Sequence, residues 1–477
     1  MKRGVERSQD QAWLRSPELW AARQYATVQL PDERLNKRLV QLASTLAAKP
    51  GDSLPQACGD WAQTKGAYRF LENERVELKP LQQPLFETTA QQCRAEKCIL
   101  CVQDTTTVSF SGSRRREGLG PVNDIVETQG LLMHGTLALN EHGMPLGWLG
   151  QQLWARDVGQ RGQAAQRRNR PLEAKESFKW IDGIRTSRDH LQALPARARP
   201  EVIHIFDREG DIYDVFAEGL QASREHLIIR SAQNRTLEES GQEGAHEAVR
   251  EAPLLGQVSL EVPRKHNQRA RRAVVQVRSR PVRLKPPVGA AYRQPIPLQL
   301  VELWEPDPPA GTPGLHWRLW TTLPAQSLEQ VARIVRFYTY RWRIEEVHLV
   351  LKSGCRVEAL QLQSAPKLFK ALALYAPIAL RIVQLRQLAR EHPTLPCTVI
   401  LQEDEWRALW TYIHRRPVEA NTPVPSISQA VLWIGRLGGH LNRKGDGMPG
   451  VRTLWRGWRD LQLLSALYRA QQGCDTS

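Results

Sequence analysis

Three carboxylates in this sequence are placed where they could form a metal-dependent catalytic site. Asp104 follows the apolar run "CILCVQ", Asp207 follows the apolar run "VIHIF", and Glu345 lies in "YRWRIEEVHLVLK", residues 340–352. Carboxylates without Cys or His partners suit hard divalent cations such as Mg²⁺ or Mn²⁺. Two such ions about 4 Å apart can activate a water or a 3′ hydroxyl and stabilise the leaving oxygen of a phosphodiester. The three residue types therefore favour phosphodiester chemistry.

The adjacent glutamates Glu345 and Glu346 are separated by a helical projection. At about 100° per residue, four polar residues fall on one stripe about 60° wide, and Glu346 lies about 100° from Glu345. The stripe consists of Tyr338, Arg341, Glu345 and Lys352. The projection therefore selects Glu345 for the site. The alternative is an exposed helix face with an ion pair between Arg341 and Glu345, worth only a few tenths of a kcal/mol.

The elements that must position these residues are two buried strands and one helix. Asp104 and Asp207 are each predicted to end an apolar strand, and in open α/β sheets the active site gathers at such ends. Asp211 is predicted to cap the helix "DIYDVFAEGL", with Asp214 in its first turn. Asp207, as the last strand residue, has no such local role in this prediction. A single aspartate at a strand end is more often a turn residue, so the argument depends on all three carboxylates together.

The rest of the chain predicts an α/β protein in three parts. Residues 1–85 are predicted to be helical, with Leu35, Leu39, Leu42 and Leu46 on one stripe. Residues 86–390 are predicted to form an α/β domain around a buried sheet, with a β-rich insertion at about 227–323. A long helix should open with a capping box of Ser327 and Gln330 and close at Gly354. Residues 391–477 are predicted to be mostly helical.

The charge of the chain points to a polyanionic partner. The sequence holds 66 Lys and Arg against 50 Asp and Glu, a formal net charge of +16, with clusters at 113–116, 167–170 and 264–272. Nucleic acid is the first candidate for such a partner, and a basic soluble protein without one is the alternative.

The sequence predicts a cytoplasmic protein that does not enter a membrane. The N-terminus has no apolar core of a secretory signal, and the best apolar run, 371–380, is far short of the roughly 20 residues that span a bilayer. Cys98 and Cys101 form a CxxC pair, but on a strand this odd spacing points the thiols to opposite faces. They are predicted to belong to the core and not to a zinc site. Glu345 and His348 spell Glu-x-x-His, as in di-iron bundles. The second copy, Glu243 to His246, lies in a Gly-containing segment and lacks the paired helical setting.

The run "YTYRWRIEEVHLVLK" resembles the Tyr, Arg, Glu, Lys signature of DDE transposases of the insertion-sequence-four family, closest to the transposon-five group. "QDTTTVSF" and "FDREGDIYD" are similar to the segments that carry the two catalytic aspartates of that family. "GAYRF", "KESFKW" and "RLGGHL" also match in order. The resemblance implies an RNase H-like, retroviral integrase-type α/β core with a β-rich insertion. It also implies a helical N-terminal domain that binds DNA ends and a helical C-terminal dimerisation domain.

The resemblance also implies the site residues. Asp104, Asp207 and Glu345 would be catalytic and would hold two Mg²⁺ ions, for which Mn²⁺ would substitute. Trp317, 21 residues before Tyr338, would stack on a base flipped from the DNA end, with Trp320 as a competitor for that role. Lys49, in the segment "AAKPGD" that departs from the family pattern, would substitute for a further basic contact. The other expected DNA contacts are Tyr338, Arg341, Lys352, Arg230, Arg38 and Arg69.

The activity implied is cut-and-paste transposition by a homodimer on paired double-stranded transposon ends and target DNA, at the bacterial nucleoid. A 3′ hydroxyl freed at the transposon end would form a hairpin that is reopened before strand transfer. Two alternatives remain: a structure-specific nuclease on the same fold, and a DNA-binding relic or inhibitor without catalysis.

Overall fold

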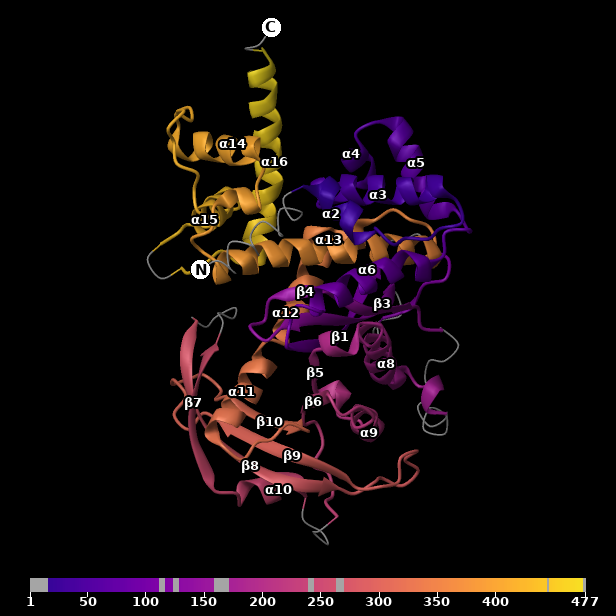
Figure 1. The fold of residues 1–477 in the computed structure, drawn as a ribbon, viewed down its shortest axis with the longest axis vertical. Helices are drawn as coiled ribbons and strands as arrows, with labels where there is room; N and C mark the ends of the chain where they lie inside the picture. The colour runs from indigo at the N-terminus through magenta and orange to yellow at the C-terminus, as the bar shows by residue number, and fades with distance from the viewer. Residues whose placement is uncertain are drawn as a thin grey trace.

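The computed structural model describes residues 16–110, 116–122, 128–157, 171–238, 244–262, 270–443 and 446–474, without the side chains of the last two (Figure 1). Most of each basic cluster at 113–116, 167–170 and 264–272 lies outside the described residues, as does Glu243. Within these ranges the chain is a mixed α/β protein with one large sheet and helices at both ends (Figure 1).

The N-terminal helices form because local caps fix where each begins. The side chain of Asp32 accepts a hydrogen bond from the backbone N–H of Arg34 at the start of α3, and Asp60 accepts from Gln63 at the start of α5. The leucine stripe predicted for α3 is confirmed, because Leu39, Leu42 and Leu46 are buried. The helices of this region are α2 (Pro17–Gln24), α3 (Glu33–Ala48), α4 (Leu54–Cys58), α5 (Trp61–Glu72) and α6 (Leu78–Cys93).

One sheet runs through the molecule in the order β2-β3-β1-β5-β6-β10-β9-β8-β7, with β4 paired to β3. The pairs β1–β5 and β5–β6 are parallel, and the others are antiparallel. Since β10 pairs with β6, strands β7 to β10 continue the same sheet. Its strands are β1 (Cys98–Phe110), β2 (Gly120–Pro121), β3 (Gln129–Asn140), β4 (Pro145–Trp154), β5 (Glu201–Phe206), β6 (Glu225–Arg230), β7 (Leu254–Val262), β8 (Arg271–Leu284), β9 (Ile296–Trp304) and β10 (His316–Thr321).

The two faces of the sheet are covered by different helices. Cys101 packs in a cluster with residues of α6 and α8 (Lys179–Gln192), whereas Cys98 belongs to the larger cluster that includes α11 (Leu328–Thr339) and α12 (Trp342–Leu349). Both cysteines are buried and free, so the prediction of a core pair on opposite faces is confirmed. Shorter elements complete the region: α9 (Tyr213–Gly219), α10 (Ala245–Arg250), and the 3₁₀ turns η3 (Leu172–Ala174), η4 (Glu176–Phe178), η5 (Ala196–Ala198), η6 (Arg208–Gly210) and η8 (Val357–Ala359).

The helix predicted from Ser327 to Gly354 is not continuous. Its capping box is confirmed, because Ser327 and Gln330 exchange side-chain and backbone hydrogen bonds. The helix tightens between α11 and α12, where the N–H of Arg341 bonds to the carbonyl of Tyr338 three residues earlier. It then widens into the π-helix η7 (Val350–Gly354). A projection at one fixed angle per residue was therefore wrong over this span.

The helix α13 (Ala365–Glu391) lies in the core of the molecule. It is buried on nearly every side and packs against β4, α6 and α12. Its 27 residues include a window of mean hydropathy 1.5, and so the expectation that no run is long and apolar enough to span a bilayer was wrong. However, 94% of that window is buried inside the protein, as befits a helix that is apolar all round and lies in the core.

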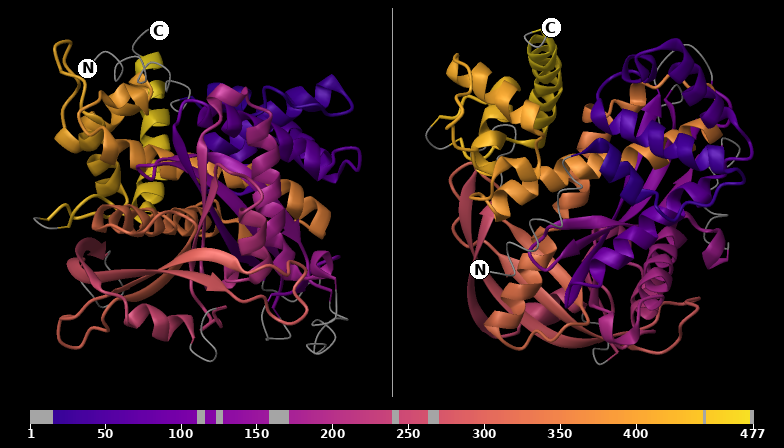
Figure 2. Two further views of the ribbon diagram at one scale, coloured as in Figure 1. Left: turned by 60° about the horizontal axis from the view of Figure 1, so that its bottom comes forward. Right: turned by 45° about the horizontal axis from the view of Figure 1, so that its top comes forward.

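The helices at the two ends of the chain meet opposite ends of α13. It contacts α3 and α5 of the N-terminal group and α15 and α16 of the C-terminal group (Figures 1 and 2). The C-terminal helices are α14 (Glu403–His414), α15 (Ile427–Leu437) and α16 (Val451–Cys474), with the 3₁₀ turn η9 (Cys397–Val399) before them.

Candidate active site

The register of two parallel strands brings Asp104 and Asp207 together. β1 pairs with β5 from Cys98 opposite Glu201 to Val102 opposite Ile205, at a constant offset of 103 residues. Extending this register by two residues sets Asp104 beside Asp207. Neighbouring strands lie about 4.8 Å apart. The two carboxylates are therefore neighbours at the carboxyl end of β5.

The sequence analysis predicted that Asp104 ends its strand, and this prediction was wrong. Asp104 lies in the middle of β1, opposite Gly135 of β3, and β1 continues to Phe110. The reason is that β3 pairs with β1 along its whole length, whereas β5 stops at Phe206. The edge at which the two aspartates lie is therefore formed where β5 ends beside the longer strand β1, and β1 itself does not end there.

Asp207 has a local structural role that the sequence analysis did not assign. It follows β5 directly and caps η6, where its Oδ1 accepts a hydrogen bond from the backbone N–H of Glu209 at 2.9 Å. Burial raises the pKa of Asp207, the Glu209 N–H lowers it, and the negative charge of Asp104 raises it further; the net pKa lies above the ordinary value. Proximity to Asp104 is thus visible in the electrostatics as well as in the register.

Asp211 does not cap the following helix, which corrects another prediction. α9 begins after Ile212, which provides no side-chain cap, although Asp214 does lie in its first turn. Asp211 is buried and instead accepts hydrogen bonds from the backbone N–H groups of Ala232 and Gln233 and from Arg235. A carboxylate with three donors in the loop after β6 is better satisfied there than at a helix end.

The two adjacent glutamates of α12 have different surroundings. The carboxylate of Glu345 contacts Arg341 at 2.6 Å, and its side chain is 35% exposed. Glu346 contacts Arg343 of its own helix at 3.0 Å and Arg386 of α13 at 2.7 Å. Burial raises the pKa of Glu346, but the two arginines outweigh it and hold that pKa below its ordinary value. Glu346 therefore joins two helices, whereas Glu345 lies on the side of Arg341.

Arg341 connects the carboxylates electrostatically. Its side chain is only 10% exposed. Burial lowers the pKa of this guanidinium, while Tyr338 and the charges of Glu345 and Asp104 raise it to a net value above the ordinary one. Its positive charge also lowers the pKa of Asp207. One buried guanidinium is thus within electrostatic reach of all three predicted metal ligands.

The remaining two residues of the predicted stripe also lie near the aspartates. Burial raises the pKa of the Tyr338 phenol, with Arg341 and Arg230 lowering it and Asp207 raising it. Burial lowers the pKa of the Lys352 ammonium, against the raising effects of Glu358 and Asp104. Despite the irregular helix, both residues stay within reach of the site.

His348 is a neighbour of Asp104 that the sequence analysis did not place in the site. Its Nδ1 lies 3.5 Å from Oδ2 of Asp104, and its Nε2 is buried without a hydrogen-bond partner among the described residues. Its position three residues after Glu345 on the same helix face was the available signal.

Trp317 lies beside the site in contact with two other predicted DNA-binding residues. Its ring packs edge-on against Tyr338, with centroids 5.2 Å apart and an interplanar angle of 67°. The guanidinium of Arg230, the last residue of β6, lies 5.7 Å from the Trp317 ring centroid. The competitor Trp320 is fully buried on the other face of β10, against Phe216. The geometry favours Trp317 for a role at the site.

The predicted DNA contacts of the N-terminal helices lie apart from the carboxylates. Arg69 is exposed on α5, and Arg38 on α3 is half-buried against Gly66, where an added Cβ would come within 2.9 Å of the Arg38 guanidinium. Lys49 is exposed at the end of α3. These cations lie on the helical group that packs on α13.

The donor chemistry of the site fits a divalent cation, although the ligands are not assembled. In the part of the chain that the structure describes, no three His, Cys, Asp or Glu side chains are arranged to hold a metal ion. Glu345 is bound to Arg341. Asp104 and Asp207, however, are adjacent carboxylates of like charge, and an oxygen-only pair of this kind suits Mg²⁺ or Mn²⁺.

Comparison with protein-family models gives three matches in order along the chain. A transposase DNA-binding model matches residues 17–76, a transposase DDE domain model matches residues 183–380, and a transposase Tn5 dimerisation domain model matches residues 377–473. The DDE match includes Asp207 and Glu345. Such a domain implies an RNase H-like α/β core and divalent metal ions, generally Mg²⁺. The chain is a Tn5-like DDE transposase, a metal-dependent DNA-cleaving enzyme whose partners are DNA and a second copy of itself.

Proposed function

We propose that this transposase moves DNA by a cut-and-paste route with a hairpin intermediate, and that Asp104, Asp207 and Glu345 hold two Mg²⁺ ions. The observation that carries the proposal is the register of β1 and β5, which when extended by two residues sets Asp104 beside Asp207, together with the contact of Glu345 on α12 with Arg341. Metal ions bound there would supply an activated water or 3′ hydroxyl and stabilisation of the leaving oxygen.

Arg341 has two roles in this proposal. It holds the carboxylate of Glu345 on one side of α12 by a 2.6 Å contact. Its charge also offsets part of the repulsion between Asp104 and Asp207, which would otherwise favour protonation of one of them. A negatively charged phosphate that enters the site competes with Glu345 for Arg341, and so frees Glu345 to face the aspartates.

Tyr338, Arg341 and Lys352 grip the terminal phosphates of the transposon end. Charge-assisted hydrogen bonds to phosphate fix the register of a DNA end without reading its sequence. Burial lowers the pKa of Lys352, and a phosphate beside it would raise that pKa again. The three side chains thus hold the scissile phosphate over the aspartates.

Trp317 receives a base flipped out of the DNA end when the hairpin forms. A tight hairpin bend is relieved by removing a base from the stack, and stacking on an aromatic ring offsets roughly 1–3 kcal/mol of the cost. The edge-on contact of Trp317 with Tyr338 leaves the ring fixed beside a proposed phosphate contact. Arg230, near the same ring, lies where it can neutralise the adjacent backbone.

Arg38 and Arg69 bind the transposon end from the N-terminal helices, and two copies of the chain pair two ends. Incubating the protein with a precleaved end, Mg²⁺ and a target plasmid tests the whole proposal. A cut-and-paste transposase joins the end to the plasmid, whereas a nuclease only cuts and a relic does neither. An uncut end supplied in parallel should yield a hairpin visible on a denaturing gel.

A further inference from the structure

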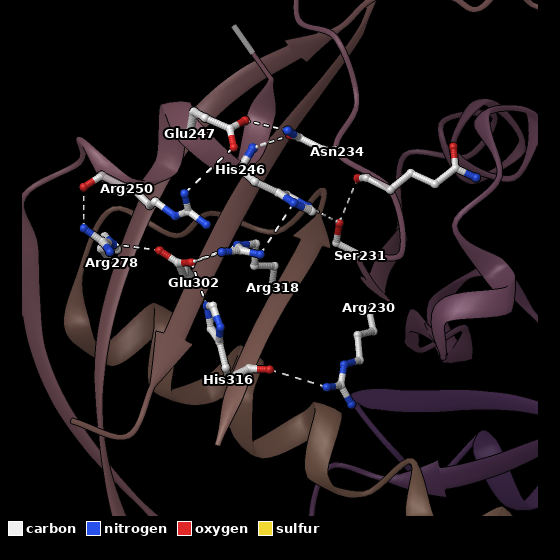
Figure 3. A network of polar contacts seen from close by, with 11 residues as sticks. Arg230, Ser231, Asn234, His246, Glu247, Arg250, Arg278, Glu302, His316 and Arg318 are labelled. Carbon is white, nitrogen blue, oxygen red and sulfur yellow. Dashed lines mark hydrogen bonds and ion pairs between the residues drawn. The ribbon is translucent and has the colours of Figure 1, made fainter. Parts of the chain in front are cut away.

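Trp317 lies between two residues that are both held by a single buried carboxylate. Along β10, His316 and Arg318 point to one face of the sheet, and Trp317 points to the other. On the first face, Glu302 of β9 accepts hydrogen bonds from His316 and from Arg318, each at 2.8 Å (Figure 3). The residues before and after Trp317 are therefore both hydrogen-bonded to one carboxylate on the opposite face of the strand.

Glu302 is buried in the sheet and hydrogen-bonded to residues of both neighbouring strands. It lies directly opposite Arg318 of β10 and opposite Arg278 of β8, and Arg278 donates a third bond to it at 2.9 Å. Its side chain is only 2% exposed. Burial raises the pKa of Glu302, but its three basic partners outweigh that effect and hold its net pKa below the ordinary value. The carboxylate thus joins three adjacent strands.

The same network reaches the strand that carries Arg230. The carbonyl of His316 accepts a hydrogen bond from the Arg230 guanidinium at 3.4 Å (Figure 3). The carbonyl of Arg318 accepts one from the N–H of Ser231 at 2.8 Å. The hydroxyl of Ser231 in turn lies 2.8 Å from His246. A shift of β10 would therefore move Trp317 and Arg230 together.

We propose that Glu302 is a positioning residue that, through His316 and Arg318, fixes the orientation of the Trp317 ring for the base that leaves the DNA end. This inference rests on the proposed hairpin function and goes beyond it, because Glu302 does not touch the DNA. A base that stacks on a ring gains most when the ring is already oriented, since ordering it during the reaction costs free energy. Replacing the carboxylate leaves Arg318 and Arg278 without their shared partner, and β10 loses the side-chain bonds that hold it to β9.

The test compares Glu302→Gln with a matched control. Glu302→Gln keeps the shape and removes the charge that binds three donors. The control is Glu218→Gln, since Glu218 is also a buried carboxylate, 8% exposed, with two arginine partners, but those partners belong to α8 and not to β10. Uncut ends carrying 2-aminopurine at the flipped position report both the nick and, by fluorescence, the unstacked base.

In Glu302→Gln the ratio of the hairpin rate to the nicking rate should fall about tenfold, because a misplaced stacking platform acts on the bent intermediate. The 2-aminopurine signal of the captured base should change in parallel. Glu218→Gln should keep the wild-type ratio even where its Tm falls. Adding Glu302→Gln to Trp317→Ala should lower the ratio no further, since Glu302 acts through that ring.

Failure of the proposed function and failure of the role of Glu302 give different results. If the wild-type protein forms no hairpin, the proposed function itself is wrong. If it forms one and Trp317→Ala keeps the wild-type ratio, the stacking role of Trp317 is wrong. If Trp317→Ala is defective and Glu302→Gln is not, only the positioning role is wrong. A further fall in the double variant, or an equal fall in Glu218→Gln, would show that Glu302 acts through general stability and would overturn the inference.

Discussion

Exchanging the two adjacent glutamates one at a time should separate catalysis from stability. Glu345→Gln should abolish cleavage and leave the fold intact. Glu346→Gln should leave cleavage in place and destabilise the fold. The reason is the difference in partners: Glu345 pairs with Arg341 one turn earlier, whereas Glu346 pairs with Arg343 of its own helix and joins α12 to α13 through Arg386.

The magnitudes follow from the burial of each pair. Breaking a fully buried ion pair costs about 3–5 kcal/mol. The Glu346 side chain is 25% exposed, and glutamine keeps one hydrogen bond, so we expect about 1–2 kcal/mol after discounting for solvent. The pair of Glu345, 35% exposed, should be worth about 0.3–0.5 kcal/mol. Loss of a partner in the second shell of a metal costs about 10–100-fold, so loss of a ligand at Glu345 should cost at least about 100-fold in cleavage.

The assay uses one labelled transposon end for cleavage and thermal unfolding for stability. Glu346→Gln should lower Tm by several degrees at pH 7. The difference should shrink with acidity: the pKa of Glu346 is lowered in the folded state, so its contribution is complete above about pH 4.3, the ordinary pKa of Glu, and is lost as pH falls below that. Cleavage lost in Glu346→Gln and retained in Glu345→Gln, at equal stability, would refute the assignment.

Three further predictions address other parts of the site. Asp207→Ala should abolish metal-dependent cleavage while end binding in a gel shift stays within about twofold, since the change removes a proposed ligand and no phosphate contact; cutting at the wild-type rate would contradict this role. Trp317→Ala should slow hairpin formation selectively, whereas Trp320→Ala should lower the free energy of unfolding by about 3–5 kcal/mol through the cavity it leaves, as denaturant titration can measure. Asp211→Asn should lower stability by about 1.5–3 kcal/mol and increase hydrogen exchange at Ala232, because charged bonds to the loop after β6 are lost; unchanged exchange would show that the loop is held by other contacts.

The aspartate pair shows how far a strand pattern can predict a site. An apolar run followed by Asp predicted that Asp104 and Asp207 lie near the edge of a buried sheet, and they are neighbours there. The register between β1 and β5 could not be predicted, because it depends on contacts between segments about a hundred residues apart. For the same reason the continuation of β1 past Asp104, which β3 sustains, was not foreseen.

The helix shows a different limit. The local capping signal of Ser327 and Gln330 was sufficient to predict the start of α11, because a cap involves only near neighbours. The choice between Glu345 and Glu346 also agrees with the structure in placing them on different sides, since both lie in α12, where the regular period holds. Lys352 lies in the π-helix, and there the fixed period fails.

The partners of each carboxylate distinguish a structural acid from a candidate ligand better than burial does. Glu346, Asp211 and Glu302 each accept hydrogen bonds from two or more donors in the surrounding protein. Losing any of these carboxylates leaves its donors without an acceptor. Asp104, by contrast, has like charge beside it in Asp207 and a histidine at 3.5 Å. The negative charge of Asp104 raises the pKa of Asp207. Repulsion between neighbouring carboxylates costs stability, and a divalent cation bound between them would relieve that cost. Addition of Mg²⁺ to the free protein should therefore raise Tm, and Asp207→Ala should abolish that increase; an equal increase in the variant would mean that the ion binds elsewhere.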